Sequence, residues 1–208
     1  MITKKKLEQL YSNEGKSMQE IANALCCSVS GVQYWIRKYK IKTRSISDAV
    51  YLKNNPNGDP FLFKKPDSFE RAILFGLGIG LYWGEGTKAN KTSVRLGNTD
   101  PALIETFIVF LEKIFGLKRS QLRFGLQIFS DMSEAQGLDF WSKTLTIEKS
   151  QFYKVTITPY RSLGTYRNKT KYGVVTVYFH NRKLRDILVK LLETGVWKKV
   201  LKQKDKPL

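Results

Sequence analysis

The chain has 208 residues, with 36 lysines and arginines against 18 aspartates and glutamates, and a formal net charge of +18. A charge of this size points to a polyanionic partner, with nucleic acid as the first candidate and an anionic membrane surface as the second. One histidine and two adjacent cysteines exclude a structural zinc site, which needs about four such ligands, and argue against a secreted disulfide scaffold. The cysteine usage favours a reducing, cytoplasmic compartment.

The sequence predicts an α+β protein in four parts. Residues 1–44 carry helical patterns, and residues 45–69 contain a dense cluster of turn formers that indicates a linker. Residues 70–200 alternate helical and strand patterns, and residues 201–208 form a basic tail. The longest apolar run is shorter than the roughly 20 residues that a bilayer-spanning helix needs, so no membrane partner is expected.

The first part is expected to form three short helices. Ser17 and Glu20 have the spacing of a capping box, and an apolar helical face follows them. A break at residues 26–28 precedes another helix with an apolar inner face. This is the layout of a helix-turn-helix, whose second helix enters the major groove of DNA. The pattern Ile21-Ala22-x-x-Leu25-x-x-Ser28-x-x-x-Val32-x-x-Trp35 resembles resolvase-type and sigma-type helix-turn-helix modules.

Several polar side chains of that second helix are expected to point away from the apolar face. They are Ser28, Ser30, Gln33, Tyr34, Arg37 and Lys38. Glutamine pairs with adenine edges and arginine with guanine edges, whereas serine and lysine usually contact phosphates. A basic arm that ends at Arg44 adds a further predicted DNA contact. The alternative is a helical oligomerisation domain with a solvated basic face.

The second part is expected to form a sheet with helices on one face. Helices are predicted over residues 70–83, 101–115, 132–144 and 182–193, and strands over residues 93–99, 122–129, 152–158 and 174–180. Each strand alternates apolar with polar residues, which is typical of an antiparallel sheet that is covered on one face. On the third strand the alternation assigns Tyr153 to the covered face.

The predicted open face carries basic, polar and aromatic side chains and no acid. They are Arg95, Arg123, Gln127, Lys154, Thr176, Tyr178 and His180. Such a surface suits phosphates and base edges; the alternative is an ordinary solvated face. Further DNA contacts are predicted in the loops, at Lys91, Arg161, Arg167, Lys169 and Lys171.

A glycine stripe marks the helix predicted at the start of the second part. Gly76, Gly80 and Gly84 recur at intervals of four residues, so they lie on one face. Glycine in a helix interior costs about 0.5–1 kcal/mol relative to alanine, which makes sense where another helix backbone approaches closely. The simplest partner is the same helix of a second copy, so a homodimer is expected.

The end of this helix carries a family resemblance. The segment Gly78-Ile79-Gly80-Leu81-Tyr82-Trp83-Gly84-Glu85-Gly86 resembles the motif of LAGLIDADG homing endonucleases. Gly80, Leu81 and Gly86 match directly, and Glu85 falls on the position of the catalytic acid. The resemblance covers residues 70 to about 195 and implies a LAGLIDADG-like α/β domain.

The resemblance implies a Mg²⁺-dependent, site-specific endonuclease acting as a homodimer on double-stranded DNA. Glu85 and its neighbour Gly84 would hold the metal, since carboxylates are ligands that Mg²⁺ prefers. Lys88, Gln127 and Lys154 would contact the phosphate or the attacking water. A metal at the scissile phosphate neutralises charge and activates water.

Two other functions compete with cleavage. A non-cleaving transcription regulator would keep the same fold and bind DNA; some bacterial sporulation regulators resemble this arrangement. A basic protein of the membrane surface is the third reading, against which the sheet-face alternation and the helix-turn-helix pattern argue.

Overall fold

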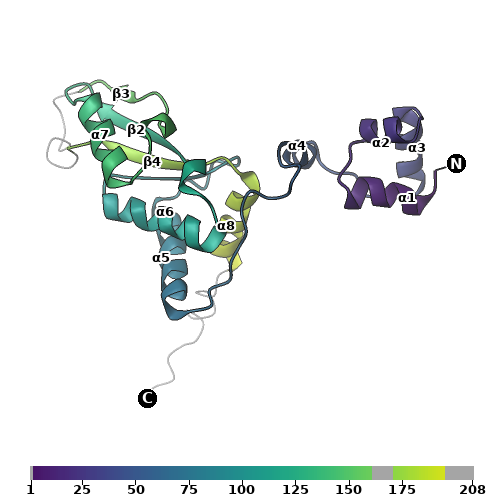
Figure 1. Cartoon of the computed structure of the whole chain (residues 1–208), viewed down its shortest axis with the longest axis horizontal. Coiled ribbons are helices and arrows are strands. Elements are labelled where there is room, and N and C mark those ends of the chain that lie inside the picture. Colours follow the sequence, from purple (N-terminus) through teal and green to yellow (C-terminus); the bar gives the residue numbers. More distant parts are fainter. Residues whose placement is uncertain (1, 161–170, 195–208) are drawn as a thin grey trace, which may run out of the picture. The chain divides into compact units, whose positions relative to one another are not determined.

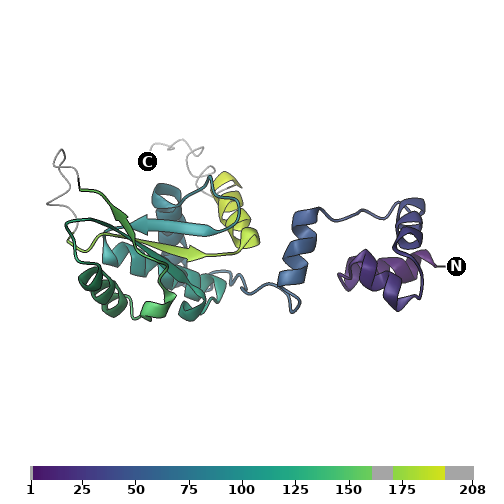
Figure 2. The ribbon, with the colours of Figure 1, turned by 90° about the horizontal axis from the view of Figure 1, so that it is seen from above.

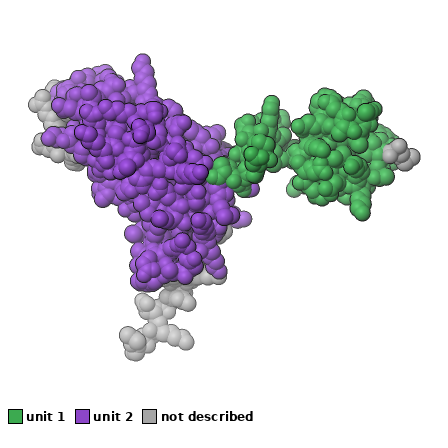
Figure 3. Space-filling view, in the orientation of Figure 1, with its two compact units in different colours: residues 1–60 green, residues 61–208 purple. Residues whose placement is uncertain are grey.

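The computed structural model describes residues 2–160 and 171–194 (Figure 1). The described chain is α+β, with helices α1–α8 and a sheet of strands β1–β4. It separates into two compact units, residues 1–60 and residues 61–208 (Figure 3). Each unit has its own hydrophobic core.

The first unit is helical. It contains α1 (Lys4–Glu8), a π-helical turn (Gln9–Asn13), α2 (Met18–Ala24), α3 (Val29–Lys38) and α4 (Ile46–Asn54). The predicted capping box at the start of α2 is confirmed: Ser17 accepts from the Glu20 amide, and the Glu20 carboxylate accepts from the Ser17 amide at 2.7 Å. A small core joins the first three helices through Leu7, Leu10, Tyr11, Ile21, Ala22, Val32 and Ile36.

The segment predicted as a linker is more structured than its composition suggests. α4 begins at Ile46, is capped by the hydroxyl of Ser45, and ends at Asn54, where the cluster of turn formers starts. After that cluster, the amides of Leu62 and Lys64 donate to the carbonyls of Phe115 and Ile114, and Phe61 is buried in the second core. The second unit therefore begins before residue 70, because the segment that contains Leu62 and Lys64 is hydrogen-bonded to the end of the helix that finishes at Phe115.

The described part of the second unit contains four α-helices and four strands, which alternate along the chain except that β4 is the next described element after β3. Its elements are α5 (Phe69–Glu85), β1 (Val94–Asn98), α6 (Pro101–Phe115), β2 (Arg123–Phe129), α7 (Glu134–Thr144), β3 (Thr156–Thr158), β4 (Val174–Phe179) and α8 (Arg182–Thr194). The strands lie side by side in the order β1-β4-β2-β3 (Figure 2).

The sheet is mixed, which corrects the prediction of an antiparallel sheet. β4 pairs antiparallel with both β1 and β2, but β3 pairs parallel with β2. The parallel pair arises because α7 connects β2 to β3, and a crossover helix returns the chain in the same direction.

One face of the sheet is buried against helices, as the alternation predicted. Val94 and Leu96 of β1, Phe124 of β2, and Val175 and Val177 of β4 are at most 1% exposed. They share a core with apolar residues of α5, α6, α7 and α8. The other side chains of these strands form the open face, which stays exposed or half-buried.

An ion cluster fixes the approach to β2. The Arg119 guanidinium binds the carboxylates of Glu105 and Glu112 at 2.6 and 3.0 Å and donates to the Leu145 carbonyl. The buried Gln151 amide donates to the carbonyls of Arg119 and Leu122. These contacts join α6, the end of α7 and the segments before β2 and β3. They therefore fix the position at which β2 begins with Arg123.

Candidate nucleic-acid interface

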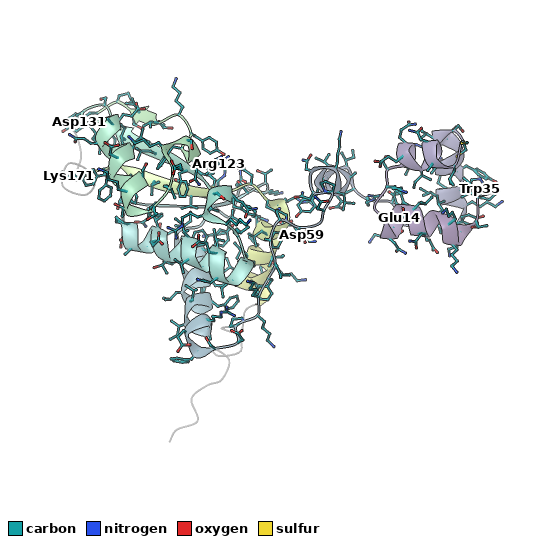
Figure 4. The ribbon with its side chains drawn as sticks, in the orientation of Figure 1. Glu14, Trp35, Asp59, Arg123, Asp131 and Lys171 are labelled. Carbon is teal, nitrogen blue, oxygen red and sulfur yellow. The ribbon has the colours of Figure 1, made fainter. Side chains whose placement is uncertain are left out.

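The outer face of α3 carries the side chains predicted to read DNA. Val32 and Ile36 are buried, so the helix presents its opposite side to solvent. Gln33, Tyr34, Arg37 and Lys38 are all exposed there. The Lys38 ammonium lies over the Trp35 ring at 4.7 Å, and Trp35 stacks on Tyr39 (Trp35 is labelled in Figure 4).

The serines at the start of α3 serve the helix itself. The Ser28 hydroxyl caps the helix by accepting from the Gly31 amide at 3.1 Å, and it also contacts the Ser30 hydroxyl at 3.0 Å. Both serines remain exposed. A cap satisfies one of the free amides at a helix start, so Ser28 positions the face as well as standing on it.

Arg44, predicted as a DNA contact, is used within the first unit. Its guanidinium lies over the Tyr11 ring at 4.2 Å and donates to the Tyr11 and Gly15 carbonyls at 3.1 and 2.6 Å. It also donates to the Lys16 carbonyl, and its backbone amide donates to the Tyr11 hydroxyl. Arg44 therefore fastens the arm after α3 to the turn before α2.

The open face of the sheet carries one cationic row across three strands. Arg95 of β1 and Arg123 of β2 are both register partners of Tyr178 in β4. The Arg95 guanidinium lies over the Tyr178 ring at 5.2 Å. Figure 4 shows Arg123 at the start of β2. In the next row the partners of Thr176 are Gly97 and Gly125, so small residues flank the central strand.

Aromatic rings gather beside this row. Tyr178 and His180 stack with ring centroids 6.0 Å apart. Tyr153 packs edge-on against both, and its hydroxyl lies 2.6 Å from His180 Nε2. Gly125 leaves room for the Tyr178 ring, because a Cβ there would come within 3.1 Å of it.

Tyr153 was assigned to the wrong face by the strand alternation. The sequence predicted a strand over residues 152–158, but β3 covers only Thr156–Thr158. Before it, Phe152 bridges to Phe124 and the Tyr153 amide donates to the Phe124 carbonyl, without a continuous strand. The break frees Tyr153 from the period of two, and it is 43% exposed on the open face. In the sequence, only the position of this aromatic residue at the start of a predicted strand could have indicated its placement on the open face.

The surroundings of His180 favour the neutral form of its imidazole. Its pKa is lowered from the ordinary value, first by partial burial and then by the positive charges of Arg95 and Arg123. The two arginines act on the same ring from different strands. His180, Arg95 and Arg123 therefore form one electrostatic group.

The carboxylate of Glu85 is exposed at the C-terminal end of α5. The next residue, Gly86, is bridged to Leu96 of β1, and the Thr87 amide donates to the Arg95 carbonyl. Glu85 therefore lies at the β1 edge of the sheet. Lys88 caps the helix, because its ammonium donates to the Trp83 carbonyl, and the Lys88 carbonyl accepts from Arg185.

The other predicted catalytic residues lie elsewhere on the sheet. Gln127 of β2 donates to the Thr158 hydroxyl at 3.1 Å, and Lys154 is exposed on the approach to β3. The strand β4 separates β1 from β2, and neighbouring strands are about 4.8 Å apart. The structure thus does not gather Glu85, Gln127 and Lys154 of one chain around one point.

The remaining predicted contacts are distributed over loops. Lys91 is exposed in the loop after α5, and the Lys171 ammonium lies over the Tyr172 ring at 5.4 Å. Arg161, Arg167 and Lys169 lie outside the described residues.

The glycine stripe of α5 faces open space. A Cβ at Gly76, Gly80 or Gly84 would meet nothing within 4 Å. The same face exposes large apolar side chains. These are Phe69, Ile73, Leu77 and Trp83, which are 76%, 47%, 52% and 50% exposed. On the opposite face Gly78 packs under the Phe110 ring, so the two kinds of glycine have different surroundings.

Comparisons with known proteins leave the chain without an assigned family. No family model matches it, and neither a curated protein nor a solved structure does. In the described parts of the chain, no helix is long and apolar enough to cross a membrane. Residues and geometry are therefore the basis for a function.

Proposed function

We propose that this protein binds double-stranded DNA sequence-specifically. The observation that carries the proposal is the open sheet face, where Arg95 and Arg123 flank the half-buried Tyr178 ring. The exposed rings of Tyr153 and His180 lie beside it, and no acid stands among the face residues named above. Such a face offers cations to phosphates and flat rings to sugars and bases. The net charge of +18 supports the same partner.

The first unit supplies the second surface. α2, the turn after it and α3 have the lengths and the buried inner face of a helix-turn-helix, with α3 as the recognition helix. Gln33 and Arg37 lie one helical turn apart on its exposed side, and glutamine and arginine are side chains that pair with adenine and guanine edges. Sequence preference is assigned to this helix, and backbone binding mainly to the sheet.

The exposed face of α5 supports a homodimer. A helix face that combines glycines with exposed leucine, isoleucine and aromatic side chains is costly to leave in water. Packing against the same face of a second copy would bury it and let the two backbones approach closely. A two-fold dimer would recognise a pseudo-palindromic site.

Cleavage is the finer part of the proposal, and it depends on this dimer. Among the described residues no three histidines, cysteines or acids form a metal-binding group, so Glu85 of a single chain does not suffice. The resemblance to LAGLIDADG enzymes places one carboxylate from each copy at the two-fold axis. Glu85, exposed at the end of α5, fits that role, and a bound Mg²⁺ would neutralise a phosphate and activate water.

The test begins with selection of a bound sequence from a random duplex library. The selected duplex is then incubated with the protein and Mg²⁺, beside an EDTA control and the variant Glu85→Gln. We expect double-strand cuts that need metal and disappear in Glu85→Gln. The matched control is Glu134→Gln, which removes an exposed carboxylate from the first turn of α7 and should cut normally.

Each outcome selects one reading. If the native protein and Glu85→Gln both bind the duplex specifically and neither cuts it, the protein is a non-cleaving regulator. That result would also rule out the proposed role of Mg²⁺. Failure to select any duplex contradicts the proposed function as a whole. For the recognition helix, Arg37→Gln should weaken and broaden selection, whereas Lys5→Gln on α1 removes the same charge and should change little.

A further inference from the structure

We propose that Arg95, Arg123 and His180 form a seat for one backbone phosphate of bound DNA, and that filling this phosphate seat places a proton on His180. The inference deepens the proposed function and rests on it, since DNA supplies the phosphate. It adds a named contact and a dependence on pH.

Three basic residues share the open face here, one on β1, one on β2 and one just after β4. Arg95 and Arg123 share one row of the sheet across Tyr178, and His180 follows Tyr178 by two residues, just after the end of β4, where the two rings stack. The positive charges of both arginines act on the imidazole. Like charges held together raise the free energy of the empty site, and an anion between them offsets that cost.

The two guanidinium groups are oriented before any ligand arrives. Arg95 Nε donates to the Ser93 hydroxyl at 2.8 Å, and Ser93 is itself bound to the Asn90 side chain at 3.0 Å. Arg123 Nη1 donates to the carbonyls of Ser120 and Leu122 at 3.3 and 3.2 Å. A guanidinium has five N–H donors, so each arginine keeps further donors for a phosphate oxygen.

The groups that face His180 come from β1, β2 and β4 and from the segment before β3. They are Arg95 on β1, Arg123 on β2, Tyr178 on β4 and Tyr153 on the approach to β3. Neither a carboxylate nor another acid of the described residues acts on the pKa of His180. An arriving phosphate would therefore add a negative charge beside two cations and the imidazole.

Tyr153 allows the imidazole to exist in both charge states. With neutral His180, the tyrosine hydroxyl donates to Nε2 across 2.6 Å; with the imidazolium, Nε2–H donates to the tyrosine oxygen. Nδ1–H is then a charged donor for the phosphate. The proton comes from solvent, so binding takes up one proton wherever the free ring is neutral and the bound ring is charged.

The experiment uses the fact that the chain has one histidine. The imidazole signal of His180 is followed by NMR against pH in three samples: the full chain alone, with inorganic phosphate, and saturated with the selected duplex. We expect the duplex to raise the titration midpoint by at least one pH unit. By linkage, DNA affinity should then be about tenfold higher below both midpoints than above them.

Variants separate the seat from general charge effects. Arg95→Gln and Arg123→Gln should each raise the midpoint of the free protein and shrink the shift caused by DNA. Lys113→Gln removes the charge of an exposed side chain on α6, which covers the other face of the sheet, and should leave both values unchanged. His180→Gln should still bind the duplex, with the pH dependence of affinity reduced.

The results separate this inference from the proposed function. A protein that binds no duplex at any pH contradicts the proposed function. A protein that binds the duplex with an unshifted midpoint overturns the phosphate seat alone. A midpoint that moves with inorganic phosphate but not with a bound duplex shows a site for a free anion, which also overturns the assignment to DNA.

Discussion

Individual arginines of this chain have different roles that residue type alone does not reveal. Arg37 is exposed on α3, Arg44 binds carbonyls of its own unit, and Arg119 holds two glutamates. The two carboxylates raise the pKa of Arg119 further above its ordinary value. The sequence placed Arg44 with the DNA contacts because it ends a basic arm, and only the folded chain shows which acceptors it meets.

Replacing Arg44 should lower the stability of the first unit rather than its affinity for DNA. Arg44→Lys keeps the charge but loses the planar fork that serves several carbonyls, so we expect the unit to lose about 2 kcal/mol of stability. A urea titration followed at the Trp35 indole NMR signal measures this loss. At low temperature, where the unit stays folded, DNA affinity should remain within about twofold, because the charge is kept.

The neighbouring Lys42→Gln serves as its control. Lys42 is exposed on the same arm, so its loss should leave the urea midpoint unchanged. A stable Arg44→Lys protein with strongly reduced DNA affinity would return Arg44 to the DNA contacts.

His180 should make stability depend on pH on the acid side. Its pKa in the folded chain lies below its ordinary value, so on acidification the unfolded chain takes the proton first. The stabilising effect of the neutral ring is therefore present above about pH 6.5 and is lost as pH falls through the folded pKa. We expect the difference in urea midpoint between the native protein and His180→Gln to shrink from pH 7.5 to pH 5.

The carboxylates of the two proteins are the same and cancel in this comparison. Parallel pH curves would show that His180 has the same pKa in the folded and unfolded chain.

At the scale of elements, substitutions at the glycines of α5 test the proposed dimer. Alanine at Gly76 and Gly80 meets no atom, so each change should stabilise the dissociated chain by about 0.5–1 kcal/mol. The same methyl groups would hold two helix backbones apart. We therefore expect Gly76→Ala/Gly80→Ala to unfold at higher urea when dilute and to self-associate less in sedimentation experiments.

At Gly78, in the same helix, alanine should have the opposite effect on stability. A Cβ there would overlap the Phe110 ring, so Gly78→Ala should destabilise the chain by about 1–3 kcal/mol. If the double variant at Gly76 and Gly80 associates as strongly as the native protein, the glycine face is not the interface.

The elements that the sequence predicted well are those with strong local signals. α6 has the predicted bounds, because Asp100 caps it, Pro101 starts it and Gly116 ends it in a left-handed conformation. β3 was predicted too long, since the apolar alternation continues through residues that pair irregularly with β2. The parallel pairing of β3 was missed for a related reason: strand direction depends on the path of the connection, not on alternation.

The candidate site was partly predictable because some of its residues lie on regular strands. The open-face positions of Arg95, Arg123, Thr176 and Tyr178 follow from a period of two within regular strands. The contact between Tyr153 and His180, and the chain from Asn90 through Ser93 to Arg95, join residues far apart or in an irregular loop. Such contacts depend on tertiary packing, which no local pattern encodes.

At the scale of the whole molecule, two separate cores imply two separate folding events. The first unit has a small core of aliphatic residues and one tyrosine, whereas the second has a large aromatic core. We expect calorimetry to show two transitions, with the helical unit melting first because less apolar area is buried in it. Arg44→Lys should lower only the first transition, and Gly78→Ala only the second; a single joint transition would contradict two independent units.

The two proposed DNA-binding surfaces should be visible in the dependence of DNA affinity on salt concentration. Each lysine or arginine that contacts a phosphate releases counterions, and the slope of log K against log salt rises by about 0.9 per contact. Residues 61–208 as a separate polypeptide should therefore show a shallower slope than the full chain, and residues 1–60 should account for the rest. Arg123→Gln should reduce the slope of the full chain and of residues 61–208 by the same amount. Equal slopes for the full chain and residues 61–208 would show that the helical unit does not touch DNA, which would leave the sheet as the sole binding surface.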